Sequence, residues 1–141
     1  MASILKVDAL QGVTSAGDIT VTSEGGSVTQ SLQQGLAKVW VMFLGSGTVS
    51  IYDALNTSSI TDVGTGQYTV NFSNNMNSAT YFTVGAPKEG TGASHSSSVD
   101  RQCNPARVPL VSSNVKYKTQ TVSQTASDVE EVYVTVNGDL A

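Results

Sequence analysis

The chain has 141 residues with 7 basic and 11 acidic side chains, a formal net charge of −4, which is the size of one domain or of two very small ones. Ser, Thr, Asn and Gln supply about a third of the residues, whereas charged residues supply 13% against the usual ~25%. Because its densest pair of cationic side chains is Lys116 and Lys118, the chain lacks the basic footprint of a nucleic-acid-binding protein.

The apolar residues and the single cysteine limit where the chain can reside and how it can be stabilised. The longest uninterrupted apolar run is Val39–Leu44, far short of the ~18 residues that span a bilayer, so we expect no membrane insertion. Lys6 and Asp8 place charges where a secretory signal would carry its apolar stretch, which predicts synthesis in a cytoplasm. Cys103 is the only cysteine, so no intrachain disulfide is possible. We interpret it as a small buried or semi-buried thiol.

Residues 1–35 differ in the pattern of their apolar residues from residues 36–141. Their apolar residues fall in short patches between Gly- and Ser-rich stretches, too few for an independent core. We interpret residues 1–35 as an extended segment that docks on something larger and anchors the chain, and residues 36–141 as the folded domain. The docking partner can be the rest of the domain, other copies of the chain or a different protein, and the sequence does not choose among them. The one helical signal, residues 31–38, is a turn or two long and is interrupted by Gly35.

Beyond this segment the pattern is that of successive β-strands. Apolar and polar residues alternate along residues 48–52, 67–72 and 132–136, a period of two that no helix satisfies. Gly45-Ser46-Gly47 and Gly64-Thr65-Gly66 separate pairs of apolar runs and predict two antiparallel hairpins.

Residues 116–122 and 129–136 flank a polar connection and predict a third hairpin. We therefore predict an all-β fold: an antiparallel β-sandwich, jelly-roll-like, with the extended N-terminal docking segment. The Ser-rich stretch 90–98 is poor in apolar residues, which predicts a surface loop.

Catalytic motifs are missing from the sequence, which contains no HExxH, GxSxG, dinucleotide-binding or P-loop pattern. Asp53 and Asp62 are the candidate carboxylate pair for a glycosidase, yet both stand at positions where backbone hydrogen bonding is common. His95, the only histidine, is most simply a solvated loop residue. The alternative is that three copies meeting on a three-fold axis bring three imidazoles to one metal. We predict no enzyme activity and no cofactor.

The run Val39-Trp40-Val41-Met42-Phe43-Leu44 does not alternate. A strand that is apolar on both sides has to be covered on both, whereas a two-layer sandwich covers one face of each sheet. We expect a second copy of the chain to supply the other cover and assign all six residues to an oligomer interface, with Trp40 as a core or interface anchor. The alternative is that the N-terminal segment supplies this cover within one protomer.

Several stretches together resemble a module of tailed-phage virion proteins, of the kind called tail-fibre or structural proteins. The stretches are Leu32–Phe43, Gly45–Val49, Ser58–Asp62 and Gly64–Phe72, and the two ends, Met1–Asp8 and Asn137–Ala141, are similar to those of short marine-phage (cyanophage-like) members. The likeness covers residues 1–10, 32–86 and 132–141, whereas residues 87–128 match no family pattern. Met42 stands where many relatives carry Asn or Asp, which makes this strand more apolar.

The resemblance implies a non-enzymatic, homotrimeric component of the virion, such as a short fibre or appendage, made in the host cytoplasm. Residues 1–35 would bind other virion proteins of the tail or capsid, and exposed loops would contact a host surface glycan. The candidate contact residues, chosen for their expected exposure, are Ser94, His95, Ser96, Tyr117 and Tyr133.

Three other functions are open. A capsid decoration (cement) protein that stabilises the head shell is favoured by the short chain, which leaves no room for a long shaft. An enzyme acting on surface glycan would use Asp53 or Asp62. A carbohydrate-binding β-sandwich would be a monomer with measurable affinity for sugar.

Overall fold

The fold is taken from a computed structural model that describes residues 5–13, 19–22, 25–88, 101–106 and 108–141. The chain divides into two compact units, Met1–Leu36 and Ala37–Ala141. Among the described residues, no helix has the length and apolar character needed to cross a membrane.

The first unit is a short hairpin followed by one helical turn. Its elements are β1 (Thr20–Thr22), β2 (Thr29–Ser31) and α1 (Leu32–Gly35). β1 pairs with β2 in antiparallel fashion, and Gly25 and Gly26 in the connection have φ values of 92° and 73°, a left-handed conformation that glycine adopts without strain. The Leu32 amide donates to the Ile19 carbonyl oxygen at 2.7 Å. None of the described residues of this unit is buried.

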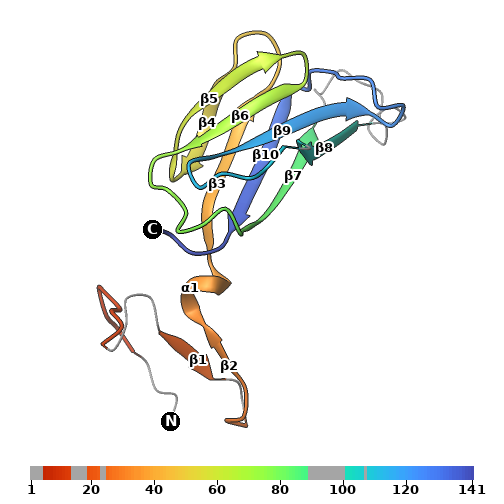
Figure 1. The fold of residues 1–141 in the computed structure, drawn as a ribbon. Helices are drawn as coiled ribbons and strands as arrows, with labels where there is room; N and C mark the ends of the chain where they lie inside the picture. The colour runs from red at the N-terminus through yellow and green to blue at the C-terminus, as the bar shows by residue number, and fades with distance from the viewer. Residues whose placement is uncertain (1–4, 14–18, 23–24, 89–100, 107) are drawn as a thin grey trace. The chain divides into compact units, whose positions relative to one another are not determined.

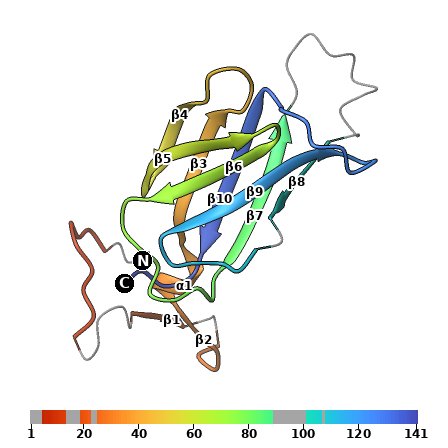
Figure 2. The ribbon, with the colours of Figure 1, turned by 45° about the horizontal axis from the view of Figure 1, so that its top comes forward.

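The second unit is a sandwich of two four-stranded sheets (Figures 1 and 2). Sheet 1 has the order β4-β3-β10-β7 and sheet 2 the order β5-β6-β9-β8, and every neighbouring pair is antiparallel. This confirms the predicted all-β antiparallel sandwich. The strands are β3 (Ala37–Leu44), β4 (Ser50–Leu55), β5 (Thr57–Gly64), β6 (Gln67–Phe72), β7 (Phe82–Lys88), β8 (Arg101–Pro105), β9 (Asn114–Thr121) and β10 (Glu131–Asn137).

The two hairpins predicted from glycine spacing are present. β3 pairs with β4 and β5 with β6, and Gly47 and Gly66 in their turns have φ values of 64° and 63°. The third predicted hairpin, residues 116–122 with 129–136, is wrong. β9 pairs with β6 and β8, whereas β10 pairs with β3 and β7, so the polar connection crosses from one sheet to the other.

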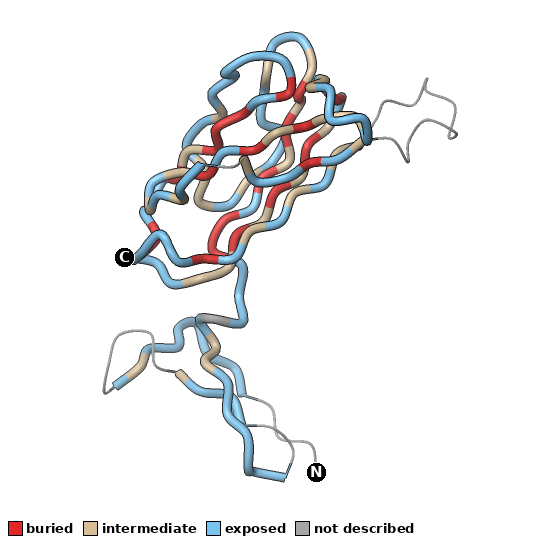
Figure 3. Tube along the Cα trace, turned by 45° about the vertical axis from the view of Figure 1, so that its right-hand side comes forward, coloured by how far each residue is buried: buried red, intermediate tan, exposed pale blue. Residues whose placement is uncertain are grey.

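The core lies between the sheets, where the buried parts of the chain face one another (Figure 3). Sheet 2 contributes Tyr68, Val70 and Phe72 of β6 to it, the face that their period-two spacing predicted. Phe43 of sheet 1 meets Tyr68 edge to face, with ring centroids 5.3 Å apart, a favourable arrangement of aromatic rings. Valine supplies much of the remainder, which makes the core lean, since valine buries little area per residue.

A polar cluster ties the crossing connection between β9 and β10 to the β5–β6 turn. The Asp128 carboxylate accepts hydrogen bonds from the Gly66 amide at 2.6 Å and from the Tyr68 hydroxyl at 3.2 Å. The Tyr68 hydroxyl also donates to the carbonyl oxygen of Gly45, at the end of β3. Burial is the main cause that raises the pKa of Tyr68 to about 12, so this hydroxyl stays a donor at all physiological pH values.

Gly66 is a position in this cluster where a side chain cannot fit. A Cβ there would lie 2.3 Å from the Thr119 carbonyl oxygen and 2.8 Å from that of Ser127. We predict that Gly66→Ala lowers the free energy of unfolding by roughly 3–5 kcal/mol, because backbone clash adds to the cost of the left-handed conformation.

Gly47→Ala is the matched control, since Gly47 has nearly the same φ and a Cβ added there would have no atom within 4 Å. It should cost only about 1 kcal/mol, the conformational term alone. Urea unfolding of both variants measures the difference, and equal losses would contradict the packing argument.

Candidate functional site: the apolar face of sheet 1

The apolar strand β3 alternates in burial although it does not alternate in hydropathy. Val39, Val41 and Phe43 are fully or almost fully buried between the sheets. The intervening residues point to the other side of sheet 1, where Trp40 keeps 37% of its surface exposed and Met42 is half-buried. The strand therefore has one side in the core of its own domain and one side outside it.

This geometry corrects half of the predicted oligomer interface. The prediction included Val39, Val41 and Phe43, but they fill the core of their own sandwich and present no surface to a second copy. The reason is the pleat of the strand, which sends successive side chains to opposite faces. Trp40, Met42 and Leu44 remain as the candidate interface residues of β3.

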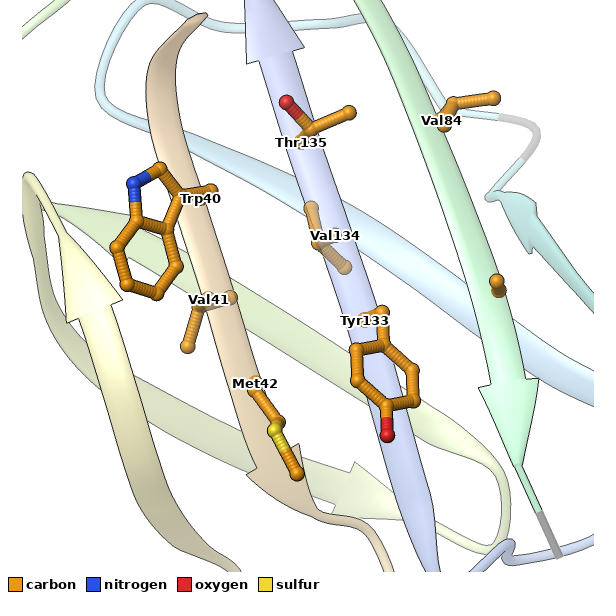
Figure 4. A pocket seen from close by; sticks show the side chains of 8 residues that line it. Trp40, Val41, Met42, Val84, Tyr133, Val134 and Thr135 are labelled. Carbon is orange, nitrogen blue, oxygen red and sulfur yellow. The ribbon is translucent and has the colours of Figure 1, made fainter.

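The neighbouring strands extend this outer side into a continuous apolar face. Tyr133 and Thr135 of β10 pair with Met42 and Trp40, and Val84 of β7 pairs with Thr135 on the far side. We use the name apolar face for Trp40, Met42, Val84, Ala86, Tyr133 and Thr135, which line a shallow groove of about 310 Å³ (Figure 4).

Further large apolar side chains lie exposed on the two edge strands of sheet 1. Leu55 of β4 pairs with Trp40, and Phe82 begins β7; both are exposed, as is Val84 at 49%. Scattered exposed apolar residues are common on soluble proteins, whereas a contiguous group of them marks an interaction surface. The outer side of sheet 1 is therefore the best candidate for a functional surface in the described part of the chain.

A charged cluster borders the apolar face. The Lys88 ammonium donates to both carboxylate oxygens of Glu131 at 2.9 Å, and the Tyr133 hydroxyl donates to the same carboxylate. The Tyr133 hydrogen bond, followed by that from Lys88, lowers the pKa of Glu131. The pKa of Tyr133 is raised, chiefly by its hydrogen bond to Glu131. An apolar centre with a polar rim is the common anatomy of a protein interface.

The outer side of sheet 2 has the opposite character. Lys116 and Thr69 pair across β9 and β6, and the Asn71 amide donates to the hydroxyls of Ser59 and Thr61 at 3.1 and 3.0 Å. This ladder of uncharged polar groups and lysine needs no cover. The two outer faces of the sandwich thus differ in chemistry, being mainly polar on sheet 2 and mainly apolar on sheet 1.

The other predicted contact residues fare differently. Tyr117 was expected to be exposed, but it is 1% exposed and its hydroxyl is hydrogen-bonded to Thr83, so this expectation is wrong: residue 117 shares the inward parity of β9. Tyr133 is half-buried on the apolar face. Ser94, His95 and Ser96 lie outside the described residues.

The two candidate catalytic carboxylates make local backbone contacts. Asp53 in β4 accepts a hydrogen bond from the Ala54 amide at 2.8 Å, and Asp62 in β5 accepts one from the Gly64 amide at 3.0 Å. They belong to different sheets. Within the described ranges, no group of three or more His, Cys, Asp or Glu side chains is placed to hold a metal ion.

Sequence reasoning missed the contribution of β7. Phe82, Val84 and Ala86 alternate with Thr83 and Gly85, which is the signal that identifies a strand. Gly85 and the following Pro87 interrupt the apolar pattern and conceal it. Gly85 is required here, because a Cβ would lie 2.5 Å from the Tyr117 ring and 2.7 Å from the Cys103 sulfur.

Comparison with known proteins finds no match: no family model matches the chain, and neither does any curated protein or solved structure. The resemblance to tailed-phage virion proteins therefore stays a prediction from the sequence.

Burial of Cys103 generates a test of this packing. Burial raises the pKa of the Cys103 thiol to about 12 from an ordinary value of 9.0. The thiol of the unfolded chain ionises at a lower pH than the buried thiol of the folded chain. The contribution of Cys103 to the free energy of unfolding is therefore fully present below about pH 9 and is lost as the pH rises toward 12. We predict slow labelling of the native chain by a thiol reagent at pH 8 and rapid labelling in denaturant.

Cys103→Ala is the control for the pH dependence. It should make the fall in urea midpoint above pH 9 shallower, and the remaining slope comes from the buried tyrosines. Rapid labelling of the native protein would show that β8 does not pack as described.

Proposed function

We propose that the chain is a non-enzymatic structural protein whose copies associate, as a homotrimer, through the apolar face of sheet 1. The observation that supports this most directly is the exposure of Trp40 on an apolar face built from three neighbouring strands. Aromatic anchors such as tryptophan often dominate the energetics of interfaces.

The energy available from this face suits association. Covering the exposed parts of Trp40, Leu55, Phe82 and Val84 contributes on the order of 5 kcal/mol per copy before the entropy of association is subtracted. In a trimer with the three faces turned toward the axis, each face meets two neighbours, and the ring closes without a free apolar edge.

The assignment to a tailed-phage virion depends on the sequence resemblance. The matching residues 32–86 include β3 and its hairpin with β4, the part of the chain that carries Trp40 and Leu55. A composition rich in uncharged polar residues with a single cysteine suits a protein assembled in a cytoplasm that then persists outside it. We propose a short fibre or appendage, with loops that contact a host surface glycan and gain strength from three-fold avidity.

A capsid decoration protein is the second candidate. The longest described strands have eight residues, which suits a compact unit seated on a shell better than an elongated shaft. Immuno-electron microscopy of the particles separates the two: label on the tail supports the appendage, and label on the head supports the decoration protein.

Trp40→Ser tests the association. We expect light scattering to give the mass of a trimer for the unaltered chain, and Trp40→Ser to weaken association roughly a hundredfold, since an indole that anchors an interface contributes about 3 kcal/mol. Because only 37% of the Trp40 surface is exposed, Trp40→Ser also removes contacts within its own sandwich, and urea unfolding at low concentration measures that loss separately from the loss of association.

Gln67→Ala, on the exposed outer side of sheet 2, is the control and should leave the mass unchanged. A monomer at all concentrations of the unaltered protein would overturn both the appendage and the decoration proposals.

A further inference from the structure

The described residues of the first unit include large apolar side chains but form no core. Val21 in β1, Val28 before β2 and Leu36 after α1 are each more than half exposed, and Leu32 is half-buried. Every member of the hydrophobic core belongs to the second unit. An isolated two-stranded hairpin is at best marginally stable in water, so β1, β2 and α1 need something else to order them.

The usual means of ordering so short a unit are missing here. Units of fewer than about 40 residues normally need disulfides, a metal or association with other chains. Cys103 and His95, the only cysteine and histidine, both lie outside residues 1–36, and this stretch contains no aromatic residue. Among the described residues there is no metal-binding cluster either. What remains is packing against another surface, of its own sandwich or of another chain.

We propose that the segment formed by β1, β2 and α1 is a second self-association element, in which the segments of neighbouring copies pack against one another. Val21, Leu32 and Leu36 line a groove of about 220 Å³ in this segment, and they are the side chains that the neighbours cover. This inference rests on the proposed function, because it takes the sandwiches to be associated already.

Chain connectivity selects copies of the same segment as the occupant. Trp40 follows Leu36 by only four positions, so the end of each segment lies within about 14 Å of the anchor of the apolar face. Association through that face gathers the segments at an effective concentration in the millimolar range. Electrostatic repulsion between the segments is small, since the charged residues of 1–36 are only Lys6, Asp8, Asp18 and Glu24.

Hydrogen exchange of the full chain tests the proposal at two protein concentrations, one above and one below the dissociation of the trimer. We expect the amides of β1, β2 and α1 to be protected in the trimer and to lose at least about tenfold of that protection on dilution. The amides of the β3–β10 core should stay protected at both concentrations, because they belong to a separate folded unit.

The double variant Val21→Ser with Leu36→Ser removes the apolar contacts of the segment. It should abolish the concentration-dependent protection and weaken trimerisation by about tenfold for each residue, while leaving the urea midpoint of the sandwich unchanged. Val122→Ser, an equally exposed valine beyond β9, is the matched control and should alter none of these quantities.

Each other outcome overturns the proposal. Protection of the segment in the monomer would mean that its own sandwich covers it, and no protection in an intact trimer would mean that a different protein does. Protection that survives the double variant would exclude these side chains as the contact. If the chain never forms a trimer, the proposed function itself is wrong. Light scattering detects this outcome independently of hydrogen exchange.

Discussion

The structure depends on one constraint: β3 is apolar on both of its sides, and a sandwich can bury only one of them. The pleat sends Val39, Val41 and Phe43 into the core and leaves Trp40 and Met42 outside. Antiparallel pairing with β4 then places Leu55 beside Trp40, and pairing with β10 places Tyr133 beside Met42. An exposed apolar face follows directly from the register of a single strand, with no special loop or cavity required.

The core that holds this strand in place is lean, and polar and glycine-dependent contacts complete it. Asp128 joins the crossing connection to the turn at Gly66 and to the Tyr68 hydroxyl, both in sheet 2. The Gly45 amide, just after β3 of sheet 1, donates to the Glu130 carbonyl oxygen at 3.1 Å, so the loop that links the two sheets is fixed at both of them. Gly85 lets the Tyr117 ring lie against the backbone of β7. These contacts are costly to remove, because they bring backbone and buried hydroxyl groups to distances at which no added methyl group fits.

The features that the sequence predicted correctly are those that depend on residues close together in the chain. The hairpins at Gly47 and Gly66 were predicted correctly because a turn and its flanking strands lie within a few residues. The pairing of residues 116–122 with 129–136 was wrong because strand partners across a long connection are chosen by contacts such as that of Asp128, which spacing does not reveal. The apolar run identified the right strand. Which of its alternating residues face outward depended on which face of the strand packs against the second sheet, and the sequence of the run does not reveal this. Tyr117 was misplaced for the same reason.

The proposed association would give these features a common physical role. The chain fills its interior largely with valine and leaves its only tryptophan, Trp40, outside the core, an arrangement that would be an aggregation hazard for an isolated domain. In such an association, the Lys88–Glu131 pair at the border of the face would limit how copies approach, since charged rims set register and specificity more than affinity. In this proposal the short N-terminal segment, joined directly to the strand that carries Trp40, would be ordered by the same assembly event. Stability that the lean core does not provide within one copy would then be recovered between copies, where it would also determine the form of the assembly.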